Sequence, residues 1–139
     1  MVDIFALDVD KVKEYLQAQQ VFASLSAEYL LKICEEISLR TFDKNECLIK
    51  EGEESAFLYL IIGGTVDVRS YGVSIATCVA GSLIGEVSAS GLSPATAEVV
   101  AASKVNTICL PVVSIHKLAG EVPTFNQTLN DAAMSRLLG

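Results

Sequence analysis

The stretch LIKEGEESAFLYLIIGGTVDV, residues 48–68, indicates the fold more specifically than any other part of this chain. Gly52 is followed by acidic residues, then by an aromatic and aliphatic run that leads into the pair Gly63-Gly64. Two glycines between two apolar runs are typical of a tight turn with positive φ. The segment after the turn alternates apolar and polar residues. The stretch therefore predicts two strands joined by a glycine turn.

Short runs rich in Val, Ile, Thr, Leu and aromatic residues extend this pattern over about 38–111, with turn residues between them. Such a series is the signature of a compact antiparallel barrel or sandwich. Strands are expected near residues 38–43, 46–50, 56–62, 65–71, 73–79, 96–102 and 105–110. The sequence therefore predicts a mainly β fold, an antiparallel β-barrel of the jelly-roll or double-stranded β-helix kind.

Helical patterns flank the predicted barrel. Residues 12–37 are expected to be helical, with Ser24 or Ser26 as an N-cap. The apolar stripe of this segment comprises Leu30, Leu31, Ile33, Cys34 and Ile37. After Pro111 the helical pattern returns, and beyond Pro123 apolar residues recur on one helix face. That second stripe comprises Phe125, Leu129, Ala132, Ala133 and Leu137.

Residues 1–139 are expected to form one domain, with helices at about 12–37, the barrel at about 38–111 and helices at about 112–139. The apolar stripe of the last helix needs a surface to cover it. Two interpretations remain open: the helix packs on its own barrel, or it pairs with a second copy of the chain.

Ten basic and 17 acidic side chains give a formal net charge of -7, which opposes the approach of a nucleic acid. The longest apolar run in the middle of the chain, residues 57–62, is far shorter than the roughly 20 residues of a membrane span. The acidic N-terminus shows no secretory signal. We therefore expect a soluble cytoplasmic protein that contacts neither nucleic acid nor membrane.

Cys34, Cys47, Cys78 and Cys109 are far apart and form no CxxC pair, and His116 is the one histidine of the chain. Neither a zinc site nor a redox motif is predicted. Four buried thiols in a reducing compartment are expected instead. Because a single histidine would have to serve every catalytic triad or dyad, the sequence indicates that the protein is not an enzyme.

A second stretch, GSLIGEVSASGLSPATAEVV at residues 81–100, combines glycines and small hydroxyl residues with an early acid, Glu86. A short helix that begins near Gly85 would direct backbone N–H groups at an anion, and glycine would allow the anion to approach closely. The stretch is therefore typical of a loop that receives a phosphate. It contains neither arginine nor lysine.

Together the two stretches resemble the cyclic nucleotide-binding domain family, of the catabolite activator and protein kinase A regulatory type. Gly85-Glu86 looks like the glycine-glutamate pair that opens the family's phosphate-binding cassette, and residues 94–101 look like its return strand. The resemblance implies that Glu86 accepts a hydrogen bond from a ribose 2′-hydroxyl. It implies no cofactor other than cAMP or cGMP and no metal. It places the ligand at Gly85, Glu86, Val87, Ser88, Ala95, Thr96 and Ala97.

The chain departs from the family at the arginine that pairs with the phosphate, because Ala95 occupies that position and Thr96 follows it. An arginine-phosphate contact is worth about 1.5–3 kcal/mol, or roughly 10- to 150-fold in affinity. Glu98, where the family usually has threonine or serine, is expected to disfavour a phosphate further. The nearest basic residue in sequence is Lys104. Three alternatives remain open. A cyclic nucleotide binds weakly through backbone N–H groups, the site has a different ligand, or the site has no ligand.

Two functions remain open. In the first, a non-enzymatic regulatory module binds a cyclic nucleotide and transmits occupancy through the helices after Pro111, by differential affinity for two arrangements. In the second, a degenerate member of the fold acts as a protein-interaction or dimerisation scaffold through its C-terminal helix. The missing arginine favours the second, whereas the retained Gly85-Glu86 pair favours the first.

Overall fold

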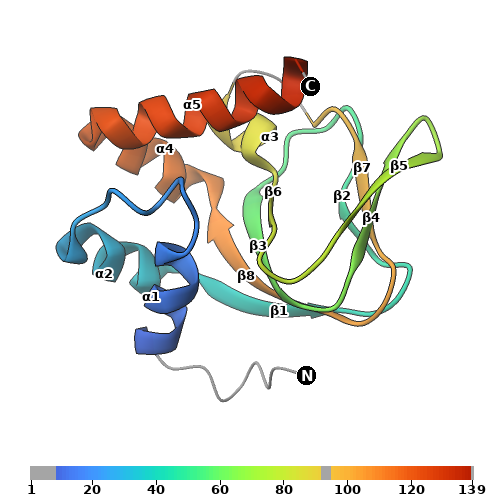
Figure 1. Ribbon diagram of the computed structural model, residues 1–139, viewed down its shortest axis with the longest axis horizontal. Coiled ribbons are helices and arrows are strands. Elements are labelled where there is room, and N and C mark those ends of the chain that lie inside the picture. The colour runs from blue at the N-terminus through green and yellow to red at the C-terminus, as the bar shows by residue number, and fades with distance from the viewer. Residues whose placement is uncertain (1–8, 92–94, 139) are drawn as a thin grey trace.

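A computed structural model describes residues 9–91 and 95–138, without the side chains of Val9, Ser88 and residues 136–138. Its strands form two four-stranded antiparallel sheets (Figure 1). The covered sheet has the order β1 (Ser38–Phe42), β8 (Val105–Pro111), β3 (Phe57–Gly63), β6 (Leu83–Ile84). The outer sheet has the order β2 (Cys47–Ile49), β7 (Glu98–Ala101), β4 (Val66–Ser70), β5 (Val73–Cys78).

The mainly β fold with flanking helices is confirmed, but the barrel is not closed. Within the described residues no strand of one sheet pairs with a strand of the other. All seven expected strands are present, with boundaries that differ by a few residues. The two-residue strand β6 was not predicted. Leu83 and Ile84 become a strand only by pairing with Leu60 and Tyr59, a long-range contact that leaves no local period to detect.

β3 is buried on both faces, which explains its unbroken apolar sequence. Side chains alternate between the two faces of a strand. Leu58, Leu60 and Ile62 belong to an apolar cluster beneath the helices. Tyr59 and Ile61 belong to a second cluster between the two sheets.

The N-terminal helical segment is two helices, α1 (Val9–Gln17) and α2 (Ala27–Glu36), where one continuous pattern was expected. The backbone between them forms turns closed by hydrogen bonds between residues three apart. One example is the bond from the Gln19 N–H to the Leu16 carbonyl oxygen at 3.0 Å. Val12 and Leu16 of α1 are also buried, whereas one continuous helix would place Val21, Phe22 and Leu25 of the connection on a different face. Tertiary packing therefore overrides the local helical pattern.

Ser26 caps α2, and its hydroxyl accepts a hydrogen bond from the Tyr29 N–H at 3.4 Å. Leu30 and Ile33 of the predicted stripe are buried. The assignment of Leu31 to the stripe was wrong, because its side chain is 46% exposed.

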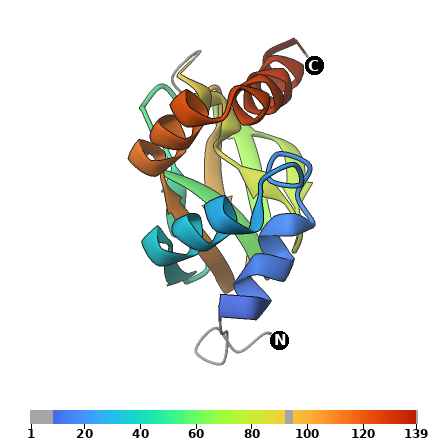
Figure 2. The ribbon, with the colours of Figure 1, turned by 90° about the vertical axis from the view of Figure 1, so that its left-hand side faces the viewer.

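The helices α3 (Glu86–Ser90), α4 (Val112–Glu121) and α5 (Pro123–Leu138) follow later in the chain. The four longer helices lie on one side of the strands, as the view from the helix side shows (Figure 2). Phe125, Leu129 and Ala133 of the α5 stripe are buried, and the first two join the cluster beneath the helices. The side chain of Leu137 lies outside the described residues. The stripe of α5 therefore packs on its own domain.

The Gly63-Gly64 turn is formed as expected, but only Gly64 has a positive φ, at +85°. A Cβ at Gly64 would lie 2.1 Å from the carbonyl oxygen of Lys104, so this position also lacks space for a side chain. Gly63 is the last residue of β3 and lies opposite Asn106 of β8.

The expectation of four buried thiols was wrong for three of them. Cys109 is buried, and burial raises the pKa of its thiol. Cys34 and Cys78 are half-buried, and Cys47 is exposed because it begins β2 at an edge of the outer sheet. All four thiols are free. Among the described residues no helix is long and apolar enough to cross a membrane.

Candidate functional site

A cavity of about 140 Å³ lies where α3 meets the inner face of the outer sheet. We call it the α3 cavity. Its lining comes from strands of both sheets, from α3 and from the segment that precedes β7. The lining residues are Ile49, Val68, Ile75, Ile84, Gly85, Glu86, Val87, Ala95, Thr96, Ala97 and Val99.

Gly85 allows the chain to turn from β6 into α3. Its φ is +100°, a region that favours glycine. A Cβ at this position would lie 3.2 Å from the carbonyl oxygen of Phe57, at the start of β3. The N–H of Ala89 donates to the Gly85 carbonyl at 2.9 Å and closes the first turn of α3. Gly85 therefore brings Glu86 against the strands.

Two backbone hydrogen bonds to the stretch 48–68 set the position of Ala95. The Ala95 N–H donates to the carbonyl of Glu53 at 3.0 Å, and the Gly52 N–H donates to the carbonyl of Ala95 at 2.8 Å. Gly52 has a φ of +83°. The glycine-acid pair after β2 and the segment that enters β7 thus form one wall of the site.

Glu86 is the one charged residue among the described lining residues. Its side chain is buried, with 5% exposed, and it interacts within the protein. The remaining lining is aliphatic or small. Six of the seven positions predicted from the resemblance therefore meet at one cavity. Ser88 lies in α3, but its side chain is outside the described residues.

The profile of the cyclic nucleotide-binding domain family matches residues 39–121, which is more than half of the chain. The chain belongs to this family. It is 28% identical over 107 residues to the cAMP-dependent protein kinase regulatory subunit of Debaryomyces hansenii, and 29% identical over 109 residues to that of Candida albicans. These matches cover 77% and 78% of this chain. The chain spans 24% of the length of either relative.

A solved structure shows the same fold. The regulatory domain of Toxoplasma gondii PKA, crystallised with cAMP, superposes with a TM-score of 0.78. The two chains are 19% identical, and the match covers 91% of this chain and 50% of the other. The two proteins therefore share this fold.

Glu98, which was expected to add negative charge where the family binds phosphate, does not line the cavity. Its neighbours Ala97 and Val99 do, so Glu98 lies on the other face of β7. There its carboxylate is 4.0 Å from the Arg69 guanidinium, whose Nε lies 2.7 Å from the Asp67 carboxylate. The expectation failed because strand alternation turns this acid away from the cavity.

No basic residue takes the place of the family's arginine among the described lining residues. Lys104, the nearest in sequence, contacts the Gly63-Gly64 turn through its carbonyl and does not line the cavity. Leu92, Ser93 and Pro94, which lie outside the described residues, include no basic residue either. The described lining thus holds no basic residue, and the assignment of the family's arginine to position 95 stays a prediction.

The strand residues of the lining were not predicted from the sequence; they are Ile49, Val68, Ile75, Ile84 and Val99. Alternation could place Val68 and Val99 on an inner face, but it could not show that a cavity lies there. The position of Ile75 in the lining could not be predicted for a different reason. Val68 pairs with Ala76 and Arg69 with Ser74, so Ile75 is the extra residue of a β-bulge.

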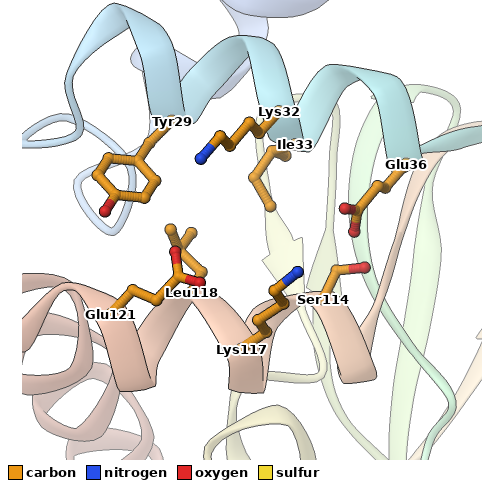
Figure 3. A pocket seen from close by; sticks show the side chains of 8 residues that line it. All are labelled: Tyr29, Lys32, Ile33, Glu36, Ser114, Lys117, Leu118 and Glu121. Carbon is orange, nitrogen blue, oxygen red and sulfur yellow. The ribbon is translucent and has the colours of Figure 1, made fainter.

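A second cavity, of about 110 Å³, lies between α2 and α4 (Figure 3). Each helix contributes four residues at the same spacing: Tyr29, Lys32, Ile33 and Glu36 from α2, and Ser114, Lys117, Leu118 and Glu121 from α4. Basic and acidic side chains are equal in number there, and Lys32 lies over the Tyr29 ring at 5.3 Å. This cavity shares no lining residue with the α3 cavity.

Proposed function

We propose that this chain is a non-enzymatic, cytoplasmic regulatory module whose α3 cavity binds a cyclic nucleotide, cAMP or cGMP. The observation that carries the proposal is the convergence of six family ligand positions on one cavity with a buried carboxylate. Two further facts support it: the matched relatives are regulatory subunits of cAMP-dependent protein kinase, and the Toxoplasma gondii domain was crystallised with cAMP.

Glu86 is the residue that would recognise the ribose. An ionised carboxylate is a pure acceptor with about four lone-pair positions, so Glu86 can interact within the protein and still accept from a ribose hydroxyl. The cyclic phosphate would rely on backbone N–H groups at the start of α3, which have no acceptor within the helix. With Ala95 in place of the arginine, we expect weak binding.

Occupancy would reach the C-terminal helices through α3. This short helix packs against α5, α4 and β3. Ala89 of α3 is fully buried in the same cluster as Phe125 and Leu129 of α5. A ligand that binds one arrangement of α3 better than another would therefore shift the packing of α5. A protein partner or a second copy would contact the uncovered face of these helices, where Val113 and Met134 are exposed.

A second function, that of an interaction scaffold with an unused cavity, is favoured by one observation. None of the described lining residues of the α3 cavity is basic. A degenerate family member would keep the fold, because Gly64 and the cluster beneath the helices are needed for folding whether or not a ligand exists.

Isothermal titration of the chain with cAMP and with cGMP separates the two functions. We expect saturable heat that Glu86→Gln weakens roughly fivefold or more, since a charge-assisted hydrogen bond becomes a neutral one. Glu98→Gln is the matched control and should leave binding unchanged, because Glu98 faces away from the cavity. No heat at high ligand concentration, together with an unchanged melting temperature, would favour the scaffold.

A further inference from the structure

We infer that the α3 cavity prefers an uncharged nucleoside to the corresponding cyclic monophosphate. The inference rests on the proposed function, in which Glu86 holds the ribose, and it names the class of ligand that the cavity accepts best. It follows from the charges around the cavity and from the character of its walls.

First, the cavity already holds one carboxylate, that of Glu86. Glu86 is the charged residue among the described lining residues, and with 5% exposure water screens its carboxylate poorly. A phosphate in the same volume of about 140 Å³ would bring a second negative charge close to the first. Like charges in one site disfavour each other. A nucleoside presents only hydroxyl and N–H donors to Glu86, so it avoids this repulsion.

The second step is the lack of a compensating cation. All ten Lys and Arg side chains except that of Arg136 are described, and none of these lines the cavity. Arg69 follows the lining residue Val68, but its guanidinium is engaged by Asp67 and Glu98 on the other face of the sheet. Lys50 follows Ile49, which lines both cavities, but Lys50 itself, like Arg40, lines only the other one. A bound phosphate would therefore have no described basic partner.

The third step is the fit of the walls. The aliphatic side chains of Ile49, Val68, Ile84, Val87 and Val99 offer dispersion contacts to a planar base. Charge and the character of the walls therefore favour the same ligand class.

The test compares four ligands on the full chain by isothermal titration: adenosine, guanosine, cAMP and cGMP. We expect at least one nucleoside to bind about tenfold or more tightly than its own cyclic monophosphate. 2′-Deoxyadenosine should bind more weakly than adenosine, and Glu86→Gln should reduce that difference, because it replaces the charge-assisted hydrogen bond to the 2′-hydroxyl with a neutral one. Circular dichroism and melting temperature check that each variant is folded.

Ala95→Arg should reverse the order of affinities by supplying the missing charge. Its two backbone hydrogen bonds to Gly52 and Glu53 hold position 95 at the cavity wall and do not depend on its side chain. We expect cAMP or cGMP to bind the variant roughly 10- to 150-fold more tightly than wild type. Ala95→Met is the matched control for side-chain size without charge, and it should give no such gain.

The outcomes distinguish failure of the inference from failure of the proposed function. If cAMP or cGMP binds wild type as tightly as the nucleosides or more tightly, the inference is overturned and the proposed function stands. If Arg136→Ala weakens the cyclic nucleotides selectively, the inference is also overturned, because Arg136 then supplies the charge. If none of the four ligands binds wild type or Ala95→Arg, both are overturned and the scaffold function is supported.

Discussion

The covered sheet and the outer sheet have the same number of strands but very different exposure. β3 and β8 of the covered sheet are buried along almost their whole length, because helices lie on one face and the outer sheet on the other. β5, at the edge of the outer sheet, is exposed along almost its whole length. Of the large apolar side chains exposed in the described residues, Tyr71, Val73, Ile75 and Val79 lie in or beside β5.

This difference indicates where the fold derives its stability and where it has freedom to change. Burial of apolar surface is the main favourable term in folding, so the covered sheet should carry most of it. Four of the five strand residues that line the α3 cavity come from the outer sheet, and one of them, Ile75, is exposed. A substitution at Ile75 should therefore change the cavity wall at a small cost in stability.

The largest expected effect comes from a truncation beneath the helices. Leu60→Ala removes a fully buried side chain from the covered sheet and should lower the free energy of unfolding by about 2–5 kcal/mol. Ile75→Ala, in the outer sheet, should change it by no more than about 0.5 kcal/mol, because that side chain is 61% exposed. Urea unfolding measures both values. Equal losses of unfolding free energy would contradict the proposed difference in stability between the two sheets.

A smaller difference between two paired variants is expected at the turn that links the two sheets. Gly64→Ala and Gly72→Ala both place a Cβ at positive φ, at +85° and +78°, which costs about 1–2 kcal/mol. Only at Gly64 does the Cβ also meet backbone, 2.1 Å from the Lys104 carbonyl oxygen, whereas nothing lies within 4 Å at Gly72. We expect Gly64→Ala to be more destabilising by a further 1–3 kcal/mol or so. If thermal and urea unfolding give the two variants the same loss, the crowding at Gly64 does not restrict the turn.

The smallest effect concerns the ionised groups on the exposed face of the outer sheet. Hydrogen bonds, first from the Ser74 hydroxyl and then from Arg69, hold the pKa of Asp67 below its ordinary value. A lowered pKa stabilises the fold above the pKa of the unfolded chain, and this contribution is lost as the pH falls through the folded value. Ser74→Ala should raise the pKa of Asp67 in a carboxyl titration followed by NMR. Thr77→Ala, opposite Asp67 on β5, is the control and should not.

Much of the fold could be predicted because its signals are local. The strands follow from runs of β-branched and aromatic residues, and Ser26 follows from its place before an apolar stripe. The break between α1 and α2 and the strand β6 could not be predicted, because long-range packing creates both. The same holds for the exposure of Leu31 and Cys47, which depends on what the neighbouring elements leave uncovered.

The candidate site shows the same division. The sequence by itself determined which residue types are present: the Gly85-Glu86 pair, alanine at position 95, and a loop without a basic residue. Only the tertiary structure decided that these residues share a cavity with Ile49 and Val68, that Glu98 faces away from it toward Arg69, and that α5 covers its own domain. The physical reason is that residue chemistry belongs to each position, whereas strand register and helix packing are set by contacts between distant segments.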